Sequence, residues 1–130
     1  GDGLPAGEYA LCEMFCDERG CDCRRVFLCV VCQGRPGMEA VIAYGWEDAA
    51  FYAEWLHDGD PEMVAELQGP VLNMGSPAAP WAPILLELVK RFALGDAAYV
   101  ERIKRHYLMF RDKVERRRSR RRKQTKKRRR

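Results

Sequence analysis

The chain has 130 residues, of which 47% are hydrophobic and 32% are charged, a composition typical of one globular domain. It contains no stretch approaching the roughly 18 uncharged apolar residues that a transmembrane helix needs, and no secretory signal is visible. We therefore expect a cytoplasmic protein whose six cysteines stay reduced. In that setting clustered cysteines bind metal more often than they form disulfides.

The net charge of +4 divides between two very different segments. Residues 116–130 hold 12 of the 23 Lys and Arg and no acidic residue. Residues 1–115 are left with 11 basic and 19 acidic side chains, a net charge of −8. A strongly basic segment repels itself and buries no apolar area, so we expect 116–130 to be a disordered, low-complexity tail. Residues 1–7, rich in Gly and Pro, are expected to be a flexible lead-in to a domain over 8–115.

Three segments have the alternation and the β-branched content of strands. They are residues 8–15, 25–32 (RVFLCVVC) and 39–44 (EAVIAY). Short connections between consecutive strands favour an antiparallel meander. Glu13 places a carboxylate on an apolar face of the first strand, and we expect it to pair with Arg24 or Arg25 across the hairpin.

From residue 47 onward the apolar period changes to that of helices. Helices are expected over residues 47–56, 60–67, 81–94 and from 97 into the 110s, with a loop over 70–80. Asp60 and Asp96 are expected to cap the second and the last of these helices. The predicted fold class is α+β: a three-stranded antiparallel sheet with a Cys-rich hairpin knuckle, covered on one face by about four helices.

The connection between the first two strands carries the chemistry. Cys16, Cys21 and Cys23 fall within eight residues, in a loop-forming context of Asp, Gly and Arg. A spacing of four residues and then one lets a tight loop aim three sulfurs at one point, and Gly20 permits a sharp backbone turn. Structural zinc sites fill four tetrahedral positions with Cys thiolates and His imidazoles. The sequence therefore predicts a structural Zn²⁺ in the 8–115 domain.

The fourth ligand is open among five residues. We favour His106, which lies on the apolar stripe of the last predicted helix, although such a histidine is often a core imidazole with one hydrogen-bond partner. His57 falls at a helix end, where a solvated role is typical. Cys12, Cys29 and Cys32 lie inside strand patterns, where free cysteine behaves as a small buried hydrophobe. Cys29 and Cys32 form a CxxC, but in one continuous strand their sulfurs point to opposite faces.

Four short motifs, with Phe110, carry a resemblance: EMFC at 13–16, CDCR at 21–24, AYGW at 43–46 and RHY at 105–107. Together they resemble an uncharacterised bacterial domain family with a CxxxxCxC knuckle, often associated with SEC-C-type zinc-binding motifs. The resemblance covers about residues 8–112 and implies a metal-binding domain with no established reaction. The Cys- and Gly-rich SEC-C motif itself is absent, since the sequence ends in Arg and Lys.

Three classes of function fit the sequence. The first is a small zinc-stabilised, non-enzymatic binding or scaffold domain. The second is association with nucleic acid or an acidic partner through the tail, which holds no aromatic residue for base stacking. The third is a thiol redox or zinc-dependent enzyme, although no HExxH, phosphate loop or zinc-deaminase pattern is present. The tail residues expected to contact phosphates are Arg116, Arg117, Arg118, Arg120, Arg121, Arg122, Lys123, Lys126, Lys127, Arg128, Arg129 and Arg130.

Overall fold

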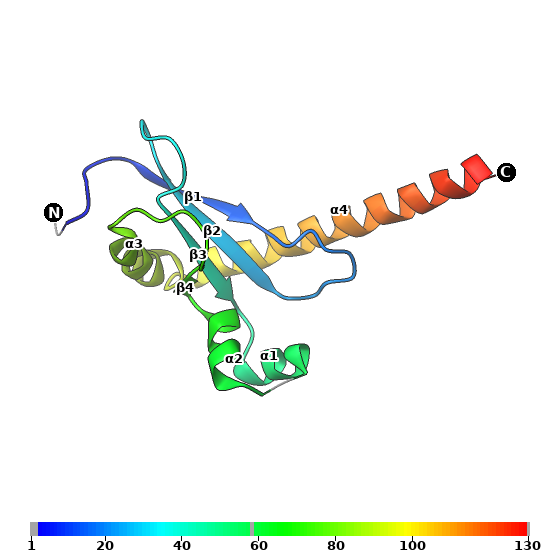
Figure 1. The fold of residues 1–130 in the computed structure, drawn as a ribbon, viewed down its shortest axis with the longest axis horizontal. Coiled ribbons are helices and arrows are strands. Elements are labelled where there is room, and N and C mark those ends of the chain that lie inside the picture. Colours follow the sequence, from blue (N-terminus) through cyan, green and yellow to red (C-terminus); the bar gives the residue numbers. More distant parts are fainter. Residues whose placement is uncertain (1–2, 58, 130) are drawn as a thin grey trace.

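A computed structural model describes residues 3–57 and 59–129, with side chains as far as residue 117. The chain folds into an antiparallel sheet and a set of helices (Figure 1), and the α+β class is confirmed. The elements in chain order are β1 (Tyr9–Met14), β2 (Arg25–Cys32), β3 (Ala40–Gly45), α1 (Ala49–Leu56), α2 (Pro61–Gln68), β4 (Val71–Leu72), α3 (Ala82–Leu88) continued by the π-helical turn η1 (Val89–Ala93), and α4 (Ala97–Arg129).

The sheet has four strands in the order β1-β2-β3-β4, and the prediction of three strands was wrong by one. The three predicted strands pair as the expected antiparallel meander. The additional strand, β4, pairs with β3 through Ile42↔Leu72 and Ala43↔Val71. Because β4 is two residues long and lies in the predicted 70–80 loop, it carries no alternation that a sequence pattern could reveal.

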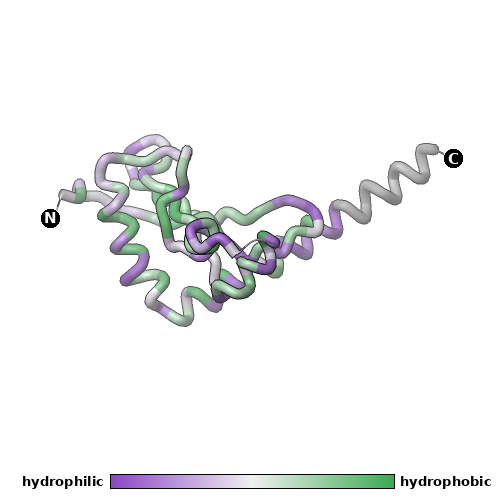
Figure 2. The backbone as a smooth tube through the Cα atoms, turned by 60° about the horizontal axis from the view of Figure 1, so that its bottom comes forward, coloured by the Kyte–Doolittle hydropathy of each residue, from purple (hydrophilic) through white to green (hydrophobic). Residues whose placement is uncertain are grey.

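The hydrophobic core lies between one face of the sheet and helices α3 and α4. The strand register places alternate residues of β1, β2 and β3 on this face, where they meet the apolar sides of the two helices. In Figure 2 segments of hydrophobic residues gather in this central region of the molecule. The buried core residues are Val26, Leu28, Val30, Ala40, Ile42, Ala82, Leu85, Val89 and Ile103. Helices α1 and α2 lie together beyond the end of β3 (Figure 1).

Helix starts follow from short acidic side chains that accept backbone hydrogen bonds. As predicted, Asp60 caps α2 by accepting from the Glu62 N–H at 3.0 Å. The predicted cap of the last helix is also confirmed, since the Asp96 carboxylate accepts from the Ala98 N–H at 3.0 Å. Asp48 caps α1 in the same way. Each cap satisfies a backbone N–H that has no partner inside the helix.

Helix α4 continues to Arg129, whereas the sequence predicted a disordered tail from residue 116. Arg, Lys and Gln are all strong helix formers, and no Gly or Pro interrupts this segment, so local propensity favours continuing the helix. In Figure 1 the end of α4 leads away from the sheet. The tail side chains from residue 118 onward, named above as phosphate contacts, lie outside the described residues. In the predicted lead-in, Leu4 packs against the core, and the Tyr9 hydroxyl donates to the Pro5 carbonyl at 2.6 Å.

Candidate metal centre

The predicted knuckle is the loop between β1 and β2. It turns at Gly20, whose φ of 70° lies in the left-handed region that glycine adopts without steric cost. The Cys21 N–H closes this turn by donating to the Glu18 carbonyl at 3.3 Å. At its far end Arg24 also has a positive φ, of 51°, which redirects the chain into β2. The chain reverses direction in this loop because the loop joins the antiparallel strands β1 and β2.

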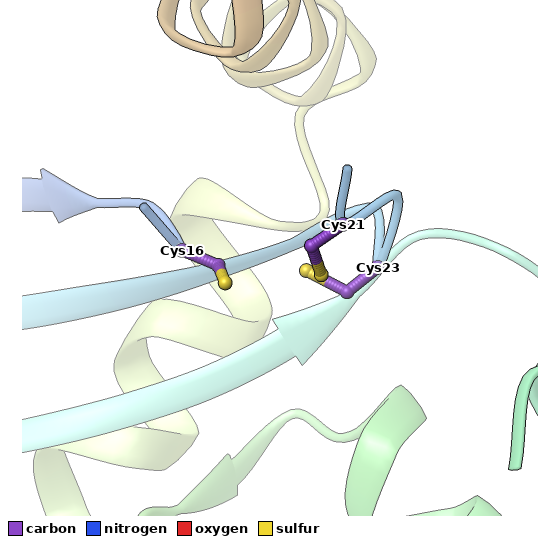
Figure 3. Close-up of side chains that lie close together, drawn as sticks. All are labelled: Cys16, Cys21 and Cys23. Atoms are coloured by element: carbon purple, nitrogen blue, oxygen red, sulfur yellow. The ribbon is translucent and has the colours of Figure 1, made fainter. Parts of the chain in front are cut away.

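The loop brings three sulfur atoms together. The Sγ atoms of Cys16, Cys21 and Cys23 all lie within 4.8 Å of one another. In Figure 3 the sulfurs of Cys21 and Cys23 lie next to each other, and the sulfur of Cys16 lies to one side of them. Cys23 is buried, and the other two are half-buried. Among the described residues, this is the group of Cys, His, Asp and Glu side chains that can hold a metal ion, as the spacing predicted.

The electrostatics of the cluster favour a cation. Burial, together with the charges of Cys23 and Cys16 and their hydrogen bonds, raises the pKa of Cys21 to about 12. Three thiolates at this separation repel one another strongly, and a bound metal cation removes that repulsion and deprotonates its thiols. The Cys16 sulfur also accepts a hydrogen bond from the Glu18 N–H at 3.4 Å.

Side chains of helix α4 hold the knuckle by hydrogen bonds to its backbone. The Arg111 guanidinium donates to the Cys16 carbonyl at 2.6 Å and to the Glu18 carbonyl at 2.5 Å. The Glu115 carboxylate accepts from the Gly20 N–H at 2.7 Å. These side chains span the loop from its first cysteine to its turn, so the conformation that gathers the sulfurs depends on a helix more than 90 residues away in sequence.

Two tyrosines fix the end of the loop. The Tyr107 hydroxyl accepts from the Arg24 N–H at 3.1 Å and donates to the Asp22 carboxylate at 3.0 Å. From α1, the Tyr52 hydroxyl donates to the Arg24 carbonyl at 2.9 Å. Both hydroxyls belong to side chains that are almost completely buried. The residue that follows Cys23 is therefore held at both its N–H and its carbonyl.

The carboxylate between the last two cysteines is already engaged. Asp22 forms an ion pair with Arg24 at 3.0 Å, and this contact, with the hydrogen bond from Tyr107, holds the pKa of Asp22 below its usual value. Arg24 also pairs with Glu47 at 3.3 Å and lies 4.6 Å from the ring centroid of Phe51. Asp22 thus orients the loop and is occupied by these partners.

His106 lies apart from the three-sulfur group. Its Nδ1 lies 2.9 and 3.1 Å from the two carboxylate oxygens of Glu13. The expected pairing of Glu13 with Arg24 or Arg25 was therefore wrong. The register sets Glu13 opposite Leu28 on the face that meets α4, while the Arg25 guanidinium donates to a carbonyl of α2. The other candidate ligands also lie outside the group: Cys12, Cys29 and Cys32 on the strands, and His57 at the end of α1.

The His106–Glu13 pair borders a groove of about 580 Å³ between the end of β1 and α4. The His106 side chain is 40% exposed, so it is reached by solvent and is not a core imidazole. The other residues that line this groove are Met14, Phe15, Met109, Phe110 and Lys113.

Sequence reasoning missed the three residues of α4 that hold the knuckle. Tyr107, Arg111 and Glu115 are spaced four residues apart, which places them along one face of a helix. That spacing was visible in the sequence, but nothing in it pointed to backbone groups of a distant loop. We call these three residues the α4 clamp.

Within the described residues, no helix is both long and apolar enough to cross a membrane. No family model, curated protein or solved structure matches the chain. The resemblance to the bacterial zinc-associated family stays a prediction.

Proposed function

We propose that this chain is a small zinc-stabilised, non-enzymatic binding or scaffold domain in which Cys16, Cys21 and Cys23 hold a structural Zn²⁺. The observation that carries the proposal is the convergence of their sulfurs within 4.8 Å. Zn–S bonds of about 2.3 Å in a tetrahedron set sulfurs about 3.8 Å apart, so small side-chain shifts suffice to bind the ion. Thiolates suit Zn²⁺ among the common divalent ions, whereas Mg²⁺ and Ca²⁺ prefer oxygen.

A metal is well suited to order this loop. Residues 15–24 form no regular secondary structure, and several of their side chains are exposed. Structural zinc contributes on the order of 10 kcal/mol, against a total stability of about 5–15 kcal/mol for a typical domain. Binding would therefore fix the knuckle against α4 and stabilise the packing of both.

A structural role is favoured over a catalytic one by the surroundings of the cluster. Three protein ligands leave one tetrahedral position for water or a further donor, which is also the arrangement of catalytic zinc. A hydrolytic zinc enzyme needs a free general base nearby, however, and Asp22 is occupied by Arg24 and Tyr107. The clamp side chains Arg111 and Glu115, in turn, are engaged with backbone groups of the loop.

The test is metal analysis of the full chain purified without chelator. We expect one zinc per chain and protection of three of the six thiols from alkylation, lost after chelation. Cys32→Ser is the matched control, because it removes a thiol outside the cluster. Protein that neither contains stoichiometric zinc nor takes it up on reconstitution would contradict the proposal. Preferential loading with copper(I) or cadmium would reassign the site to another thiophilic ion.

A second function, association with nucleic acid or an acidic partner, is supported by the charge segregation of the sequence. The 12 basic residues of 116–130 follow a body of net charge −8. Such a segment neutralises phosphates without reading bases, so its binding weakens steeply with salt. Fluorescence anisotropy with duplex DNA and with RNA, over a salt series, tests this. Binding that persists after removal of 116–130 would place the contact on the body instead.

A further inference from the structure

Two of the cysteines outside the metal cluster face each other across the β1–β2 hairpin. The strand register makes Cys12 and Cys29 direct partners. Opposed residues in an antiparallel pair share one face of the sheet. Leu28 points to the other face of the sheet, which packs against α3 and α4. The face with Cys12 and Cys29 therefore lies away from that core. Cys32, in contrast, lies opposite Tyr9.

The backbone geometry of such a pair suits a disulfide. Directly opposed residues of antiparallel strands have Cα atoms about 4.5–5.5 Å apart. Disulfides join residues whose Cα atoms are about 4.4–6.8 Å apart, so the bond between Cys12 and Cys29 needs only rotation of the side chains and a small local adjustment.

The two thiols differ sharply in accessibility. Cys12 is exposed, whereas Cys29 is only 3% exposed, and its Sγ donates to the Met14 Sδ at 3.0 Å. Burial, followed by the neighbouring charge of Cys12, raises the pKa of the Cys29 thiol. An oxidant from solvent therefore meets Cys12 first, and Cys29 is the second thiol, held beside it on the same face. This is the arrangement of an attacking and a resolving cysteine.

We propose that Cys12 and Cys29 form a redox-active dithiol that low-molecular-weight disulfides, such as oxidised glutathione, convert to a cross-strand disulfide. The Cys12 thiolate attacks one sulfur of the small disulfide, forming a mixed disulfide and releasing one thiol. Cys29 then loses its proton to solvent, attacks the Cys12 Sγ and releases the second thiol. The protein gives up two electrons and two protons, and the small disulfide takes them up as two thiols.

The position of this bond gives it a consequence for the hairpin. The loop that it closes, from Cys12 to Cys29, contains all three cysteines of the metal cluster. A cross-link across the strands directly below the knuckle reduces the conformational freedom of the unfolded hairpin. Oxidation is thus expected to slow metal release from the knuckle.

The experiment is oxidation of the zinc-loaded full chain with oxidised glutathione, followed by intact mass and peptide mapping without reductant. We expect loss of two hydrogen atoms, reversed by dithiothreitol, and one link between Cys12 and Cys29. Cleavage after arginine and glutamate separates Cys12 from Cys16 and from Cys29, because Glu13 and Arg24 lie between them.

Three variants sharpen the assignment. Cys29→Ser should stop at a glutathione adduct on Cys12, and Cys12→Ser should give no link, while the control Cys32→Ser should form the link as the parent does. The proposal is overturned if Cys12 of the parent keeps its glutathione, if both cysteines stay reduced, or if the only links join other cysteines. Failure of the metal proposal would be distinguishable, since it would appear as adducts or links at Cys16, Cys21 and Cys23.

Discussion

Replacing Tyr107 with phenylalanine removes one oxygen atom and keeps the ring. The ring packs edge-on against Trp46 and Phe15, with centroid separations of 5.0 and 5.9 Å, so the apolar contacts survive. Two hydrogen bonds are lost with the hydroxyl, one that it accepts from the Arg24 N–H and one that it donates to the Asp22 carboxylate. We expect the free energy of unfolding to fall, and the knuckle to bind metal more weakly.

The magnitude follows from the two partners. A hydrogen bond to a charged group contributes about 1.5–3 kcal/mol, with the low end appropriate here because water can replace the hydroxyl at the exposed Asp22. The Arg24 N–H loses a partner beside a tyrosine that is 2% exposed, where an unsatisfied donor costs about 1–3 kcal/mol. We therefore expect a loss of about 2.5–4.5 kcal/mol. Removal of groups that orient metal ligands typically costs about 10–100-fold in affinity, and we expect zinc affinity to fall in that range.

The assay is urea unfolding with and without zinc, combined with competition against a chromogenic chelator. Tyr99→Phe is the matched control, because Tyr99 lies on the same helix and its hydroxyl makes no hydrogen bond within the described part of the chain. Its effect should stay within about 0.5 kcal/mol. The reasoning is refuted if Tyr107→Phe matches this control in both unfolding free energy and zinc affinity.

The remaining predictions concern the ligands, the histidine and the tail. Cys23→Ser should abolish stoichiometric zinc by elemental analysis, whereas Cys32→Ser should retain it. His106→Ala should keep one zinc per chain and lower the unfolding free energy by about 0.5–1.5 kcal/mol, because the contact with Glu13 is lost. Loss of zinc in this variant would instead show that His106 is a metal ligand. Removal of 116–130 should leave the melting temperature of the body nearly unchanged and abolish affinity for DNA, as measured by calorimetry and anisotropy.

The sheet and the cysteine cluster were predictable because their signals are local. The β-branched run of residues 25–32 has a composition that favours a strand, and it forms β2. Cys16, Cys21 and Cys23 lie within eight residues of sequence around the turn at Gly20, so their spacing alone pointed to one cluster. Strand β4 was not predictable, because two residues carry no period and its pairing with β3 depends on tertiary position.

The partner of the knuckle could not be predicted because neighbouring helix positions face different neighbours. His106 and Tyr107 lie side by side on the apolar side of α4, separated by about 100° around the helix axis. Periodicity identifies the buried side of a helix but does not fix its rotation to that accuracy. In the structure Tyr107 meets the knuckle and His106 meets Glu13. A histidine is recognised in a sequence as a possible metal ligand, whereas a tyrosine that hydrogen-bonds to backbone groups has no sequence motif.

The α4 clamp links the two features that the sequence separates, the cysteine knuckle and the basic tail. Its contacts join residues more than 80 positions apart, and Glu115, which accepts from Gly20, directly precedes the tail. Under the proposed function, a bound metal would hold the backbone groups of the knuckle in fixed positions for α4, and without the metal the loop would be freer to move. Each clamp contact then costs more conformational entropy to form. Under the proposed function, metal binding at the three cysteines would therefore hold α4 more firmly at the point where the basic segment begins.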